Sequence, residues 1–116
     1  KDPSRRKTAA LDWEFWDIEP GFNDLAAFIA LNWFADMRRE RELDLVRRYR
    51  DQLASRGIDL TWEQCRDGYR LAVVKHVLTP VKQQVNGLQV RSWWVNLQRI
   101  VTAYIDLDCR ELIARL

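Results

Sequence analysis

Hydrophobic residues recur at helical spacing along much of this chain. The clearest case lies between residues 37 and 56, where apolar side chains three and four positions apart share one face: Leu43, Val46, Tyr49 and Leu53. This spacing predicts one long amphipathic helix, and Gly57 suits the left-handed position that often follows a helix end. The opposite face is charged, and Arg38 and Glu42 lie one turn apart with opposite sign. We interpret this charged face as solvated and linked by salt bridges.

Capping residues predict where this helix and the one before it begin. Asn23 or Asp24 is suited to cap a helix that starts at about residue 25, and Asp36 is suited to cap the long helix. Residues 25–34 carry apolar side chains on all sides. That pattern predicts a deeply buried helix.

The sequence pattern of the second half of the chain predicts further helices. Thr61 and Gln64 match a capping box. The helix that they start should end near residue 78, because Pro80 cannot continue it comfortably. A later helix over about residues 90–105 presents one apolar face, which consists of Trp93, Leu97, Ile100 and Tyr104.

Asp108 and Glu111 match a second capping box, which predicts a short last helix. The expected fold is therefore mainly α, with about five helices in one domain over residues 13–116. Residues 1–12 are expected to form a tail or a short strand. A lone strand is not stable, so its partner would come from preceding sequence or from another molecule. The chain also begins with Lys1 rather than Met, and we expect a removed tag or a natural reading frame that starts further upstream.

The amino-acid composition narrows the classes of function that this protein could have. Apolar residues make up 47% and charged residues 31%, and the net charge is +2, which fits a soluble protein rather than a nucleic-acid binder. No apolar run approaches the roughly 20 residues of a membrane span. The single His76 leaves no partner for a histidine-based metal site or nucleophile couple. Cys65 and Cys109 are expected to be free, buried thiols in a reducing compartment, which indicates the cytoplasm.

Three stretches of sequence, taken in order, resemble one enzyme family. Residues 10–28 read ALDWEFWDIEPGFNDLAAF, residues 45–58 read LVRRYRDQLASRGI, and residues 61–73 read TWEQCRDGYRLAV. They resemble the aminoglycoside-phosphotransferase-like and choline-kinase-like small-molecule kinases. In that family a strand ends in a metal-binding Asp, a loop with a Gly follows, and a helix starts with Asp-Leu-Ala. The matching positions are Leu11, Asp12, Trp13, Glu14, Gly21, Asp24, Leu25 and Ala26.

The resemblance implies a kinase-like fold and phosphoryl transfer from ATP to a hydroxyl group of a small molecule, with Mg²⁺ as cofactor. Asp12 would bind Mg²⁺ in the intact parent enzyme, and Asp24 would cap its helix. The chain lacks the family's Gly-rich loop, phosphate-binding Lys and His-Gly-Asp…Asn loop. It therefore resembles only the carboxy-terminal helical part of such a kinase. We expect no catalytic residue in this chain, no bound Mg²⁺ or ATP, and no activity alone.

Four residues are candidates for the substrate side of the parent enzyme. Glu14 and Asp17 belong to an acidic loop that would border the cleft, although we favour the simpler interpretation of a solvated acidic loop. Trp93 and Trp94 are neighbours on a helix and point about 100° apart, so one of them is free to line a pocket. The six tryptophans are otherwise expected to pack mostly in the core. Asp67, Tyr69 and Arg70 look structural, as a buried aromatic with a flanking charge pair.

A second hypothesis comes from another class. The chain would be a stand-alone, non-catalytic helical module for interaction or dimerisation. Apolar side chains near its amino-terminal end would then form a self-association surface, which consists of Leu11, Trp13, Phe15, Phe22 and Phe28. The two hypotheses predict different partners: a small hydroxyl substrate for the parent kinase, or a second copy of this chain. Neither involves nucleic acid or a membrane.

Overall fold

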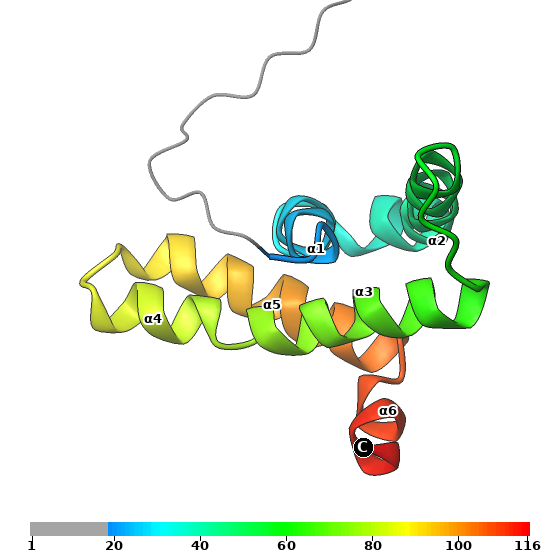
Figure 1. Cartoon of the computed structure of the whole chain (residues 1–116). Helices are drawn as coiled ribbons and strands as arrows, with labels where there is room; N and C mark the ends of the chain where they lie inside the picture. The colour runs from blue at the N-terminus through cyan, green and yellow to red at the C-terminus, as the bar shows by residue number, and fades with distance from the viewer. Residues whose placement is uncertain (1–18) are drawn as a thin grey trace, which may run out of the picture.

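A computed structural model describes residues 19–116, and this part of the chain is mainly α-helical (Figure 1). The prediction of a mainly α fold is confirmed. The expected amino-terminal strand, together with Asp12, Glu14 and Asp17, lies outside the described residues. The helices are α1 (Phe22–Ala30), α2 (Ala35–Ala54), α3 (Trp62–His76), α4 (Thr79–Val85), α5 (Val90–Asp106) and α6 (Cys109–Arg115).

Helices α3 and α5 form the centre of the fold, because each of them contacts every other helix. In Figure 1, α3 and α4 follow one another along the front of the molecule, and α1 and α2 are viewed nearly end-on above α3. Helix α6, which carries the carboxy terminus, lies on the opposite side of α3 from α1 and α2.

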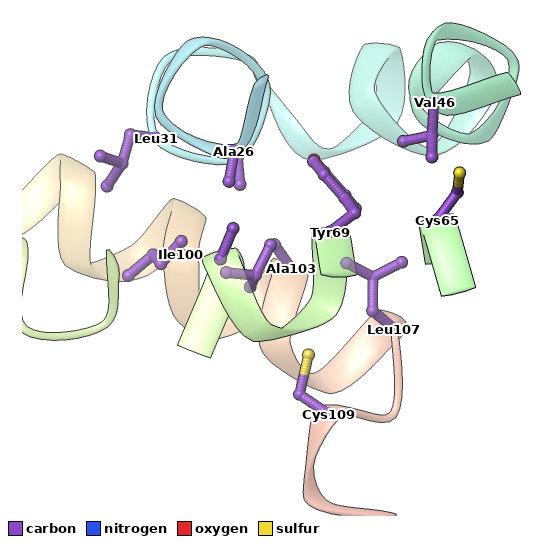
Figure 2. Close-up of a cluster of buried hydrophobic side chains, with 12 residues drawn as sticks. Ala26, Leu31, Val46, Cys65, Tyr69, Ile100, Ala103, Leu107 and Cys109 are labelled. Atoms are coloured by element: carbon purple, nitrogen blue, oxygen red, sulfur yellow. The ribbon is translucent and has the colours of Figure 1, made fainter. Parts of the chain in front are cut away.

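The buried core lies where α1, α2, α3, α5 and α6 meet (Figure 2). Many of its members are small, so helix backbones approach closely, and little apolar volume is enclosed. The core cluster consists of Ala26, Ala30, Leu31, Val46, Cys65, Tyr69, Ala72, Val73, Ile100, Ala103, Leu107 and Cys109. Both cysteines are free and buried, as predicted.

The capping box at the start of α3 is confirmed. The Thr61 hydroxyl accepts from the backbone N–H of Gln64 at 3.1 Å, and the Gln64 side-chain oxygen accepts from the backbone N–H of Thr61 at 2.9 Å. The predicted glycine turn after the long helix is also present. Gly57 has φ +84°, a left-handed conformation that glycine adopts without a steric penalty.

The predicted caps of α1 and α2 are wrong. Gly21 occupies the N-cap position of α1 and Phe34 that of α2, and neither start has a side-chain cap within residues 19–116. Asp24 and Asp36 instead lie inside the first turns. The helices begin earlier than predicted, because the Pro20–Gly21 turn and the extended backbone of Phe34 set their starts. Each carboxylate still interacts favourably with its helix dipole.

The predicted capping box at Asp108 is also wrong. Asp108 adopts a left-handed conformation with φ +51°, and its side chain makes no capping bond in the described chain. Arg70 accounts for the difference, because its guanidinium donates to the Asp108 carbonyl and to the Glu111 carboxylate. The ion pair of Arg70 with Asp67, at 3.0 Å, confirms the structural interpretation of that charge pair.

Helix α4 is an element that the sequence analysis missed. Pro80 does end the preceding helix early, at His76, but it then lies in the first turn of α4. A proline is tolerated there, because the N–H that it lacks would have no partner within the helix. The described residues 19–116 thus contain six helices, one more than the five expected.

Burial differs from the prediction at the tryptophans and in α1. Trp33, Trp62 and Trp93 are only half-buried, and Trp94 is exposed. Trp62 nevertheless packs against the core cluster, so the expectation of a mainly core role is wrong only for Trp33, Trp93 and Trp94 among these four. Helix α1 does bury Ala26 and Ile29, but Phe28 on its other side is exposed.

Candidate functional site

A groove lies at the junction of α1 and α3, next to the point where residues 1–18 join the described part of the chain. Its cavity has a volume of about 410 Å³ and an almost wholly apolar lining. The lining residues are Pro20, Phe22, Asn23, Gly68, Leu71, Ala72 and Lys75. We take this groove as the candidate functional site, because the segment with Asp12, Glu14 and Asp17 leads directly to it.

Two glycines near Phe22 are required by close contacts with aromatic side chains. A Cβ atom on Gly68 would lie 2.8 Å from the Phe22 ring, so only glycine allows α1 to approach α3 this closely. A Cβ atom on Gly21 would collide with the Tyr49 hydroxyl. The rings of Phe22 and Tyr49 also meet edge to face, with centroids 5.1 Å apart.

This junction joins the three stretches of sequence that carry the family resemblance. Phe22 comes from the first stretch, Tyr49 from the second and Gly68 from the third. The three residues lie far apart in the chain, and their contacts bring the stretches together at the mouth of the groove. No signal in the sequence marked Phe22 as the contact point, although the glycine in α3 is an unusual choice inside a helix.

A polar cluster holds the start of α1 against the end of α3. The Lys75 ammonium group and the Asn23 amide both donate to the Glu19 carboxylate. The hydrogen bond from Lys75 lowers the pKa of Glu19 below its ordinary value. Lys75 is thereby neutralised at the edge of the groove, which leaves the groove apolar in character.

His76 ties the same region to the start of α4. Its Nε2 lies 3.1 Å from the Asn23 carbonyl oxygen, and its Nδ1 lies 3.1 Å from the Thr79 hydroxyl. A carbonyl only accepts, so Nε2 carries the proton, and Nδ1 accepts from the hydroxyl. Burial lowers the pKa of His76. The imidazole is therefore neutral and fully hydrogen-bonded, as expected of a structural group rather than a free catalytic base.

The predicted substrate-side tryptophans do not line this groove. Trp93 and Trp94 lie near the start of α5, with ring centroids 5.9 Å apart and planes nearly perpendicular. Trp94 is 48% exposed, which agrees with the expectation that one of the pair reaches the surface. Their role toward a substrate stays a prediction, as do the roles of Glu14 and Asp17.

A second hollow, of about 290 Å³, lies against the exposed face of α2. Its lining combines an indole with charges of both signs, namely Trp33, Arg41, Asp44, Leu45 and Arg48. Asp44 is already paired with Arg47 at 2.9 Å. Because the hollow presents opposite charges side by side, it selects no particular class of ligand.

The interior holds a charged cluster that the sequence analysis placed in solvent. Arg38 and Glu42 are 1% and 3% exposed, so the interpretation of this pair as solvated is wrong. They are linked at 2.6 Å, and Arg38 also binds Asp106 of α5. A signal was available, because residues 38 and 42 continue the helical spacing of the buried Val46.

Within residues 19–116, no three His, Cys, Asp or Glu side chains come together in a way that would hold a metal ion. The groove therefore offers no multidentate cation site, and the residue matched to a metal ligand, Asp12, lies outside the described part. None of the six helices has both the length and the apolar character needed to cross a membrane.

Comparison with protein-family models, with curated proteins and with solved structures gives no match for this chain. The interpretation of the groove thus depends on the residues themselves. They build an apolar recess with a neutralised rim, which suits binding or positioning rather than proton transfer.

Proposed function

We propose that this chain is the carboxy-terminal helical part of a small-molecule kinase of the aminoglycoside-phosphotransferase-like type, and that it is inactive alone. One observation carries the proposal. Phe22, Tyr49 and Gly68, from the three stretches that resemble this family, meet at one junction. The junction gives the three stretches one fixed arrangement around the end of the segment that carries Asp12, and their order along the chain is that of the family they resemble.

In this proposal the helices position the segment that precedes α1. The contacts of Gly21 and Phe22 fix where that segment enters the fold, and the bonds to Glu19 from Lys75 and Asn23 hold its last part. Asp12 would bind Mg²⁺ in the parent enzyme, which supplies charge neutralisation for phosphoryl transfer. The helices themselves contribute support and an apolar wall, and the catalytic base would come from another part of the parent.

The groove supports a place beside a small-molecule substrate. Its lining is almost wholly apolar, and its one amine is already paired with Glu19. Such a wall suits the non-polar body of an alcohol substrate, whose reacting hydroxyl would lie toward the preceding segment. Glu14, Asp17, Trp93 and Trp94 stay candidates for contacts with the same substrate.

The proposal is tested first with the chain as given. Purified chain is incubated with Mg²⁺ and ATP and with a panel of sugars, aminoglycosides and amino alcohols, and phosphorylated product is sought by mass spectrometry. We expect no product and no saturable binding of ATP in calorimetry. Turnover by the chain alone that is lost in an Asp12→Asn variant would contradict the claim that catalysis requires further parts.

The second candidate, a non-catalytic interaction module, is favoured by a different observation. Large apolar side chains are exposed on every described helix, with Phe28, Met37, Leu71, Val81, Trp94 and Ile113 among them. Such surfaces are typical of chains that are covered by a partner or by another part of the same protein. Both candidates require such a cover, and they differ in whether the covering part carries a nucleotide site.

A further inference from the structure

The groove at the junction of α1 and α3 has its floor on one face of α3. The α3 residues that line it stand at positions i, i+3, i+4 and i+7 of that helix, namely Gly68, Leu71, Ala72 and Lys75. Gly68 and Ala72 are small, and the recess above them has a volume of about 410 Å³. Leu71 is 42% exposed. An apolar side chain that entered the groove would therefore remove apolar surface from water on both partners, which is favourable.

The rim of the groove fixes the place where the preceding segment reaches it. Glu19 accepts hydrogen bonds from Lys75 and Asn23, and both of these residues line the groove. Pro20, the next residue along the chain, lines it as well. Residues 13–18 are therefore tethered directly at the rim. A short tether is equivalent to an effective concentration on the order of 1 mM, so a free ligand or a second copy would compete only at a comparable concentration.

The sequence of this segment suits an apolar recess. Residues 13–18 read WEFWDI, and most of them are large and apolar. Aromatic and β-branched residues favour extended backbone, and a residue that precedes a proline, as Glu19 does, is biased toward it. Alternate side chains of an extended chain share one side. Trp16 and Ile18 then fall on the same side as Pro20, which is the side that faces the groove.

We propose that residues 13–18 dock in this groove, with the side chains of Trp16 and Ile18 against Leu71. The proposal goes beyond the proposed function and does not depend on it, since it requires neither catalysis nor a substrate. In a parent kinase the docked indole would extend the apolar wall beside the substrate. In a stand-alone module it would cover apolar surface of α3.

The dimensions of the groove agree with this arrangement. Leu71 lies one helical turn before Lys75, which is about 6 Å along the axis of α3. For a segment that runs back along α3 in extended form, Ile18 lies about 3 Å and Trp16 about 10 Å beyond Glu19. Leu71 then falls between the two apolar side chains.

The same arrangement keeps carboxylates out of the groove. Asp17 falls on the outer side, together with Glu19. Glu14 falls on the inner side, but it lies about 17 Å from Glu19 along an extended chain. The face of α3 from Gly68 to Lys75 is only about 10 Å long, so Glu14 lies beyond the groove. Docking therefore avoids the cost of burying a charge without a partner.

Disulfide trapping tests which side of the segment faces the groove. Ile18→Cys combined with Leu71→Cys should form an intramolecular disulfide under mild oxidation. Asp17→Cys combined with Leu71→Cys is the matched control, and it should cross-link at least about tenfold more slowly, because its side chain lies on the outer side. Peptide mapping identifies the bond, and non-reducing electrophoresis separates intramolecular from intermolecular products. The native thiols are buried and do not interfere.

Thermal unfolding of the full chain tests the contribution of the indole. Trp16→Ala should lower the thermal midpoint by about 4–8 °C, the shift expected when one apolar contact of moderate strength is lost in a domain of this length. Trp13→Ala is the matched control, because it removes the same kind of side chain from the outer side, and its shift should be less than half as large. In a Leu71→Ala background, Trp16→Ala should have little further effect, since the contact is already lost.

Three results would overturn the proposal. One is equal cross-linking of the Ile18→Cys and Asp17→Cys chains, or no intramolecular disulfide in either. Another is an equal shift of the thermal midpoint for Trp16→Ala and Trp13→Ala. The third is a disulfide that forms only between chains, which would assign the groove to a second copy. Circular dichroism establishes that each variant is folded before it is compared.

Discussion

The hydroxyl of Tyr69 donates a hydrogen bond to the Glu42 carboxylate, with the two oxygens 2.9 Å apart in the interior between α2 and α3. The same carboxylate accepts from Arg38 at 2.6 Å, and Arg38 reaches Asp106 of α5. Burial raises the pKa of Tyr69 well above its ordinary value, so the phenol stays protonated and keeps donating. This chain of bonds links α2, α3 and α5 through the buried Arg38 and Glu42, and it ends at the partly exposed Asp106.

Breaking the buried cluster should destabilise the fold strongly. Glu42→Ala leaves Arg38 buried with only Asp106 to compensate it, and we expect a loss of about 3–5 kcal/mol in the free energy of unfolding. Tyr69→Phe removes one hydrogen bond and should cost about 1–2 kcal/mol. Urea denaturation measures both values. Asp44→Ala is the control, because its exposed ion pair with Arg47 should contribute less than about 1 kcal/mol.

The effect of Gly68→Ala on the free energy of unfolding should change sign when Phe22 is also replaced, and a double-mutant cycle measures this. Gly68→Ala places a Cβ atom against the Phe22 ring, and overpacking of this kind costs about 1–3 kcal/mol. In a Phe22→Ala background the clash is absent. The same substitution should then stabilise the helix by about 0.5–1 kcal/mol, as alanine normally does relative to glycine. An identical effect of Gly68→Ala in both backgrounds would show that the two residues do not pack as described.

His76 should make stability depend on pH in the mildly acidic range. Burial lowers its pKa in the folded state, so the unfolded chain binds the proton more readily. The neutral His76 ring therefore contributes to the free energy of unfolding. This contribution is fully present above the pKa of about 6.5 that histidine has in the unfolded chain, and it is lost as pH falls toward the lower pKa of the folded state. Burial raises the pKa of Glu42, so the contribution of Glu42 to the free energy of unfolding changes with pH in the opposite direction.

The measurement for His76 is therefore a difference between two proteins. Unfolding free energies of the native chain and of a His76→Gln variant are compared between neutral and mildly acidic pH. Glutamine keeps a donor and an acceptor but does not titrate. The native chain should lose stability relative to the variant as pH falls. A constant difference would contradict the assignment.

The two thiols should be unreactive in the folded protein. Both are buried, and burial raises the pKa of Cys109 to about 11 and that of Cys65 above its ordinary value. Because the thiolate is the reactive form, Ellman's reagent near neutral pH should detect almost no thiol until denaturant is added. Rapid reaction of the native protein would show that the core opens readily around α3 and α6.

The sequence predicted the major helices, because amphipathic spacing and the Thr61 capping box are local signals. It failed where a local signal competed with a distant contact. Asp108 looked like a capping residue, but its backbone is left-handed and Arg70 binds its carbonyl oxygen. Pro80 does end the preceding helix, as predicted, but it also lies in the first turn of α4, which the sequence analysis missed.

The candidate site was less predictable than the helices. The groove exists because α1 lies against α3 at Gly68, and neither helix alone indicates that crossing. The burial of Arg38 likewise depends on Asp106, a residue far along the chain. The residues matched to the kinase family in the segment before Glu19 lie outside the described part, so their roles stay predictions.

The most direct test of the central claim is to read the coding DNA upstream of Lys1 and to assay the protein that it encodes. We predict a continuous reading frame with a Gly-rich loop, a phosphate-binding Lys and a His-Gly-Asp…Asn loop. The longer protein should phosphorylate a small hydroxyl compound with ATP, and Asp12→Asn should abolish that activity. A start codon immediately before Lys1, or a longer protein without these elements, would contradict the claim.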